Sequence, residues 1–145
     1  MTVFMDTSVL VAAFVARHDK HGRSKAAVLR VQKGLDQGFL AVHTLAELYA
    51  TLTGMTRPSR QRPRTVEDVL RNNVFPYFRL LYLRPDDYKL TISRLVKADL
   101  PGGIIYDALI YQTATKIDFD LFLTNNVSDF QRVATPGLAK RIRAP

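Results

Sequence analysis

Cysteine is absent from this chain of 145 residues. Disulfide bonds and metal sites built on thiolates are therefore excluded. Long apolar segments are missing too, since the longest uninterrupted apolar stretch, Val9 to Ala16, is far too short to span a bilayer. A signal peptide is not indicated, because no Lys or Arg precedes the apolar residues and Asp6 interrupts them. We expect a cytoplasmic protein that does not associate with a membrane.

Acidic residues are in the minority, with 13 Asp and Glu against 21 Lys and Arg and a formal net charge of +8. Such an excess favours a polyanionic partner, because surface cations release counterions from a phosphate backbone. A basic protein without that partner is the plainer alternative. Hydrophobic residues make up 47% of a chain of one-domain length, so we predict a single domain over residues 1–145 with a basic C-terminal tail from about residue 137.

Short apolar segments alternate with helical patterns along the whole chain. Four strands are predicted, at residues 3–5, 39–42, 80–83 and 121–124. Thr44 and Glu47 have the spacing of a capping box at the start of the helix that follows the second strand. Parallel strands need crossover connections, so this alternation predicts a three-layer α/β/α sandwich around a short parallel sheet.

Single acidic residues stand in the most apolar parts of the chain. Asp6, Glu47 and Asp129 each come soon after a predicted strand, at the sheet edge where open parallel sheets bind ligands, and Asp107 lies near the start of a helix. Gathering carboxylates in such surroundings is costly unless a cation lies among them. Oxygen ligands without His or Cys favour Mg²⁺ or Mn²⁺. The pattern therefore predicts a metal site.

Each of these residues also has a plainer interpretation. Asp6 and Asp129 are suited to capping a helix, and Glu47 to completing the capping box. Asp107 is suited to meeting the dipole of its helix, and Asn126 to a turn. No single position decides between structure and catalysis.

Four segments together carry a recognisable pattern. They are FMDTSVL at 4–10, LAEL at 45–48, GIIYDALI at 103–110 and LTNNVSDF at 123–130. In order and spacing this set resembles the four motifs of the PIN-domain family, and most closely those of the VapC-type toxins of toxin–antitoxin pairs. The resemblance implies an endoribonuclease with a Rossmann-like fold that uses Mg²⁺ or Mn²⁺, forms a homodimer and is held inactive by a cognate antitoxin protein.

The resemblance also implies roles for individual residues. Asp6 and Asp107 would be the principal metal ligands, with Glu47 as a third catalytic acid. Thr7 and Ser8 would orient Asp6.

The last motif departs from the pattern of some relatives, which have Asp where this chain has Asn126. We therefore expect Asp129 to be the fourth catalytic acid and a metal ligand, with Asn126 as a neutral ligand or supporting group. Thr124 would help to position this loop. Candidate contacts to RNA phosphates come from the basic loop and the tail: Arg57, Arg60, Arg62, Arg64, Lys140, Arg141 and Arg143. Solvated surface charge is the alternative for them.

Other functions remain as alternatives. A phosphatase with an aspartyl nucleophile would want a second acid two residues after Asp6, where this chain has Ser8, and dinucleotide binding would want a Gly-rich loop there. A DNA-binding repressor is disfavoured because no helix-turn-helix segment is evident. The remaining alternative is a PIN-like scaffold that binds RNA or a protein without cutting, although all four acidic positions are filled.

Overall fold

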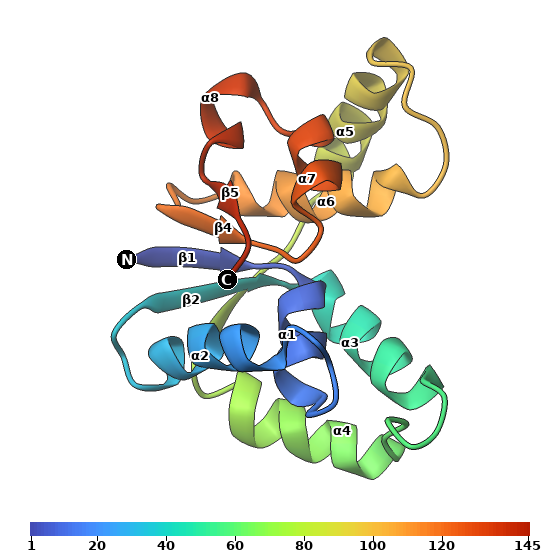
Figure 1. The fold of residues 1–145 in the computed structure, drawn as a ribbon. Coiled ribbons are helices and arrows are strands. Elements are labelled where there is room, and N and C mark those ends of the chain that lie inside the picture. Colours follow the sequence, from blue (N-terminus) through green and yellow to red (C-terminus); the bar gives the residue numbers. More distant parts are fainter.

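A five-stranded parallel sheet forms the centre of the computed structural model, which describes all residues from Met1 to Pro145. The strands are β1 (Thr2–Met5), β2 (Gln37–Ala41), β3 (Phe78–Leu81), β4 (Leu121–Leu123) and β5 (Ile142–Arg143). They lie in the order β3-β2-β1-β4-β5, so the first strand of the chain is the middle strand of the sheet. Figure 1 shows the sheet between two groups of helices, which confirms the predicted α/β/α class.

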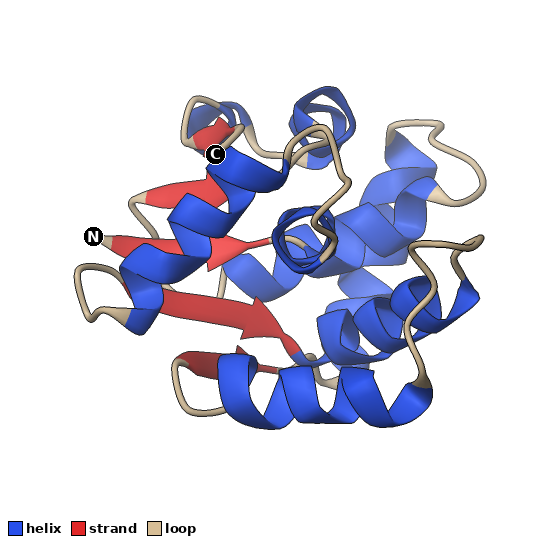
Figure 2. Cartoon of the chain, turned by 60° about the horizontal axis from the view of Figure 1, so that its bottom comes forward, coloured by secondary structure: helices blue, strands red, loops and turns tan.

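The helices divide between the two faces of the sheet (Figures 1 and 2). One face carries α1 (Thr7–Phe14), α2 (His21–Gln32), α3 (Val42–Gly54) and α4 (Pro63–Val69), the last continuing into the π-helical turn η1 (Leu70–Val74). The other carries α5 (Pro85–Lys97), α6 (Ile104–Ala114), α7 (Val127–Val133) and α8 (Pro136–Ala139). No helix is both long enough and apolar enough to cross a membrane.

Successive residues of β1 supply two separate cores, because neighbouring side chains of a strand point to opposite faces. Val3 and Met5 pack with Leu48 and the other apolar residues of α1 to α4. Phe4 packs on the opposite face, where its ring stacks on that of Phe122 with 5.3 Å between centroids. The middle strand is therefore fully covered, and its end is fixed from both sides.

The order of the strands creates a crevice between β1 and β4. From β1 the chain proceeds to β2 and β3 in one direction, then returns across the other face to β4 and β5 on the far side. Connections that leave neighbouring strands in opposite directions open a crevice at the carboxyl ends of those strands. The Asp6 N–H donates to Leu123 O at 2.9 Å, so the pairing of β1 with β4 runs up to this point.

The structure corrects two local predictions. The sequence predicted a basic tail and no fifth strand, but Ile142 is only 3% exposed and pairs with Phe122 as part of β5. A two-residue strand is too short to show a periodic pattern. The predicted capping box is also wrong, because α3 begins at Val42 directly after β2, which places Thr44 inside the helix and buries it completely.

Gly38 of β2 is the one glycine whose missing side chain is required by close packing. A methyl group there would lie 2.5 Å from Val31 Cγ1 and 2.6 Å from Phe78 Cδ1, so α2 and β3 would have to move apart. We expect Gly38→Ala to lower the free energy of unfolding by about 1–3 kcal/mol, as measured by urea denaturation. Gly22→Ala is the matched control, because Gly22 lies in α2 with no atom near the added methyl, and Ala there favours the helix. Equal stability of the Gly38 variant and the wild type would contradict the packing argument.

Candidate active site

An open hollow of about 480 Å³ lies at the carboxyl ends of β1 and β4, in the crevice that the strand order creates. Acidic and polar side chains dominate its wall, which takes residues from α1, α3, α6 and the loops after α1 and β4. The lining residues are Asp6, Thr7, Ser8, Val11, His18, Lys20, Glu47, Ala50, Thr51, Asp107, Asn125 and Asn126. Three of the four predicted catalytic acids are therefore brought together from distant parts of the chain.

Asp6 is the most deeply placed of these acids, with only 3% of its surface exposed. Its Oδ2 accepts hydrogen bonds from the Ser8 hydroxyl at 2.6 Å, the Ser8 N–H at 3.2 Å and the Thr124 hydroxyl at 3.0 Å. Burial raises the pKa of Asp6, and these hydrogen bonds to its charged form oppose the rise. Because all three donors bind Oδ2, Oδ1 accepts none of them, so Asp6 caps α1 with one oxygen and keeps the other for a ligand.

Glu47 extends into the hollow from the second turn of α3. The Thr7 hydroxyl donates to Glu47 Oε2 and lies 3.3 Å from the Thr44 hydroxyl. The His43 ring lies on the other side of the carboxylate, with Nε2 3.4 Å from Oε1, and stacks on the Tyr106 ring at a centroid distance of 6.1 Å. His43 directly follows the strand predicted at 39–42, but in the structure it belongs to α3 and contacts a site residue. Thr7 supports Glu47, not Asp6.

Asp107 lies in the first turn of α6 and is half-buried at the hollow. Burial, and after it the negative charges of Asp6, Asp129 and Glu47, together raise its pKa to about 6. No cation offsets these effects. Outside the hollow the buried acids behave differently: Arg30 lowers the pKa of Asp36 through two hydrogen bonds, for example.

The loop after β4 is fixed by hydrogen bonds to the first turn of α1. The Asn125 N–H donates to the Ser8 hydroxyl at 2.9 Å, and the Asn125 side chain donates to the Ser8 backbone oxygen at 3.0 Å. The Asn126 N–H donates to the Thr124 hydroxyl, also at 2.9 Å. Ser8 and Thr124 therefore hold Asp6 and this loop at the same time.

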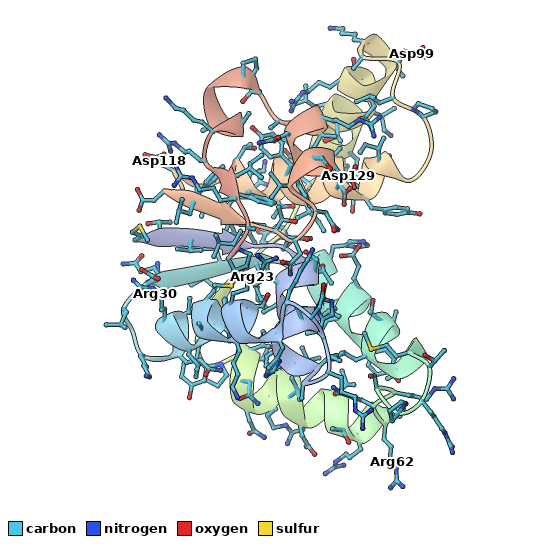
Figure 3. The ribbon with its side chains drawn as sticks, viewed as in Figure 1. Arg23, Arg30, Arg62, Asp99, Asp118 and Asp129 are labelled. Carbon is cyan, nitrogen blue, oxygen red and sulfur yellow. The ribbon has the colours of Figure 1, made fainter.

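Asp129 is the predicted acid that the structure does not bring to the wall of the hollow. Its side chain is 48% exposed in the first turn of α7, and its Oδ1 lies 4.0 Å from Arg132. Its charge still contributes to the raised pKa of Asp107, so the two carboxylates are near each other. Asn126, three residues earlier, does line the hollow. In Figure 3 Asp129 lies to the right of the strands, toward which β1 points, and Asp118 lies to their left.

The chemistry of these donors fits a hard divalent cation. No three carboxylate or histidine side chains form a ready-made ion-binding cluster in this arrangement. The free oxygen of Asp6 and the carboxylates of Glu47 and Asp107 are nevertheless oxygen donors of the type that Mg²⁺ and Mn²⁺ prefer. Their mutual repulsion, expressed in the raised pKa of Asp107, is what a bound cation would relieve.

The basic candidates for RNA contact lie in different places. Arg57, Arg60 and Arg62 are exposed on the loop between α3 and α4, and Figure 3 shows Arg62 pointing away from the sheet. Arg64 belongs to α4, not to the loop, and is exposed there.

The tail residues divide between the two edges of the sheet. Lys140 and Arg141 precede β5 and lie at the amino edge, where Arg141 donates to Asp118 at 2.8 Å, away from the hollow. Arg143 ends β5 on the carboxyl side, and its backbone oxygen accepts from the Thr124 N–H at 3.0 Å.

Six residues of the wall were not predicted from the sequence, and the polar or charged side chains of His18, Lys20 and Asn125 are among them. His18 and Lys20 come from a polar connection with no motif, and Asn125 is adjacent to the Asn126 that was considered. The local sequence does not indicate that a loop residue lines the hollow when its position depends on the path of the loop. Only Asn125 could have been found from the sequence, because it lies within the fourth motif.

Comparison with known proteins places the chain in a family. The PIN domain family matches residues 3–136. The chain belongs to the PIN-domain family. This PIN-domain chain is also 35% identical over 109 residues to Ribonuclease VapC40 from Mycobacterium tuberculosis, a match that covers 75% of each chain. It is therefore homologous to VapC ribonucleases, and the resemblance seen in the four motifs is confirmed.

Two solved structures share the fold of this PIN-domain chain. VapC20 from Mycobacterium tuberculosis, described as a Sarcin-Ricin loop cleaving toxin, has a TM-score of 0.64 at 20% identity and covers 83% of this chain and 87% of its own. VapBC2 from Rickettsia felis, bound to a DNA fragment from their promoter, has a TM-score of 0.66 at 19% identity and covers 99% and 98%. At these identities the two structures establish the fold alone.

The raised pKa of Asp107 predicts a pH-dependent stability. Because the folded chain favours the protonated form, ionised Asp107 destabilises it above pH 6, and this cost disappears as the pH falls toward the ordinary value of 3.8. In metal-free protein we expect Asp107→Asn to be more stable than wild type at neutral pH by about 1 kcal/mol, a value reduced for solvent screening at a half-buried group, or a melting temperature higher by about 2–4 °C. The difference should shrink toward pH 4. Thermal melts in EDTA across this range test it, and a difference independent of pH would contradict it.

Proposed function

We propose that this VapC-type PIN-domain chain is a metal-dependent endoribonuclease that hydrolyses RNA phosphodiester bonds. The observation that carries the proposal is the convergence of Asp6, Glu47 and Asp107 on one open hollow in a chain of net charge +8. Acids that share a hollow without an ion pair to Lys or Arg suit a catalytic metal, while an overall positive charge suits a polyanionic substrate. The homologous Ribonuclease VapC40 supports the same activity.

Asp6 and Asp107 would hold Mg²⁺ or Mn²⁺, with Asp129 on the outer side of the site. When bound, the metal supplies a water of lowered pKa and a positive charge for the phosphate oxygens. Asn126 in place of a further acid leaves the site with less negative charge.

The protein groups then have separable tasks. Ser8 and Thr124 fix the orientation of Asp6 through three hydrogen bonds. Thr7 holds Glu47, whose carboxylate would orient the attacking water and accept its proton. Exposed arginines of the loop between α3 and α4 would contact phosphates farther along the RNA.

A toxin of this type would act with a cognate antitoxin and as a homodimer, and we propose both partners here. The solved assembly of VapBC2 with DNA from their promoter supports the first. Exposed apolar side chains support a protein interface: Val42, Tyr82, Tyr88, Ile92 and Val96 are 43–73% exposed, and the first three line a groove between α3 and α5.

We expect light scattering after gel filtration to give twice the mass of 16.4 kDa for the purified chain, and the mass of one chain at all concentrations would contradict a dimer.

Cleavage of RNA by purified protein tests the activity directly. With Mg²⁺ or Mn²⁺ we expect the chain, freed of any co-purified partner, to cut total cellular RNA, and EDTA to stop the reaction. Asp107→Asn should reduce the rate by at least about 10²-fold, because it removes a ligand of the metal. Asp118→Asn makes the same change in an exposed acid at the far edge of the sheet and should cleave like the wild type.

Two negative outcomes have different meanings. No cleavage by a protein that still binds Mn²⁺ through Asp107 would point to a narrow RNA target. No cleavage together with no carboxylate-dependent Mn²⁺ binding would overturn the proposal in favour of a PIN-like scaffold without catalysis.

A further inference from the structure

One cation faces the acidic hollow. Lys20 lies in the connection between α1 and α2, directly before the first residue of α2, and it is the only Lys or Arg among the twelve residues that line the hollow. It shares this wall with the carboxylates of Asp6, Glu47 and Asp107. An ammonium group near three acids would ordinarily form an ion pair with one of them.

Lys20 does not form that pair. None of the ion pairs of the chain includes it, whereas Lys89 pairs with Asp86 and Lys116 with Asp87. Its Nζ donates to the backbone oxygen of Asn125 at 3.3 Å. An ammonium group has three N–H donors, so this single contact leaves two of them and the full charge for another acceptor.

The position of Lys20 is set by two contacts. Its backbone N–H donates to His18 Nδ1 at 3.1 Å, which closes the loop before α2. Its Nζ is tied to Asn125, whose own N–H donates to the Ser8 hydroxyl that also holds Asp6. Lys20 is therefore linked to Asp6 through Asn125 and Ser8, and both side chains line the same hollow.

We infer that Lys20 binds the phosphodiester of the substrate in the hollow, beside the carboxylates that would hold the metal. This inference rests on the proposed ribonuclease function and adds a substrate-binding residue to it. A phosphate oxygen supplies the anionic acceptor that Lys20 lacks in the free protein. Three carboxylates repel a phosphate, so an ammonium on the wall offsets part of that repulsion at the place where the backbone must enter.

A purely structural role for Lys20 makes a different prediction. If its only task were to tether the Asn125 loop, its loss would change the melting temperature but not the salt dependence of RNA binding. A lysine that contacts a phosphate releases counterion when RNA binds, so its removal reduces the slope of log affinity against log salt by about 0.7 for single-stranded RNA. Salt dependence therefore separates the two roles.

The experiment compares Lys20→Met, Lys20→Arg and a control, Lys33→Met. Lys33 follows the last residue of α2 at the opposite end of that helix, where it is exposed and has no ion pair. Initial rates on total RNA with Mn²⁺ give kcat/KM. Binding of a fluorescein-labelled, mixed-sequence single-stranded RNA is measured by anisotropy between about 50 and about 200 mM KCl, with each substitution placed in the non-cleaving Asp107→Asn protein.

We expect Lys20→Met to lower kcat/KM by about tenfold or more and to reduce the salt slope, with Lys20→Arg retaining most of both and Lys33→Met changing neither. An unchanged slope and rate in Lys20→Met would overturn the inference while leaving the proposed function intact. A loss that only follows a lower melting temperature would overturn it as well. If the wild type does not cut RNA but Lys20→Met still reduces the slope, the function fails and the phosphate contact stands.

Discussion

Repulsion among carboxylates that share one hollow is the constraint on which the rest of this structure depends. Asp6 is almost completely buried and Asp107 half-buried, and burial together with the neighbouring negative charges raises the pKa of each. Elsewhere the chain pairs its buried acids, as it does Asp36 with Arg30 and Asp87 with Lys116. Three acids left without such partners at one place represent a cost that folding alone does not repay.

The fold meets that cost by supplying rigid support in place of opposite charge. Strand β1 lies in the middle of the sheet, so helices cover it on both faces. Because β4 pairs with β1 on the side opposite to β2, Thr124 lies beside Asp6. Hydroxyl groups bind these carboxylates where Lys and Arg bind other buried acids of the chain. Ser8 and Thr124 donate to Asp6, and Thr7 donates to Glu47. Hydroxyls stabilise the ionised carboxylate without neutralising it, so the negative charge remains available for a metal.

The sequence predicted correctly those features that depend on a short, local segment of the chain. The strands β1 to β4 and the acids within apolar segments were predicted because burial and charge conflict visibly in the sequence. The sequence did not predict β5, because two residues are too few to show a periodic pattern. It also gave the wrong start for α3, where the Thr44 hydroxyl binds the Thr7 hydroxyl and does not cap its own helix. Lys20 could not be predicted, because its meaning depends on a loop that meets the hollow only in three dimensions. Asp129 was expected to be a metal ligand, but the structure leaves it outside the wall of the hollow.

The basic surface and the acidic hollow act over different distances. At physiological salt, the attraction between a net charge of +8 and RNA is screened over a length of about 8 Å. This attraction brings RNA to the surface, but it does not determine how a phosphate interacts with Asp107. Inside the hollow, repulsion dominates until a cation lies there. In the proposed ribonuclease, metal and phosphate therefore each lower the cost of the other, and linkage makes this coupling equal in both directions. A site with weak affinity for the free ion is then compatible with firm metal binding in the presence of RNA.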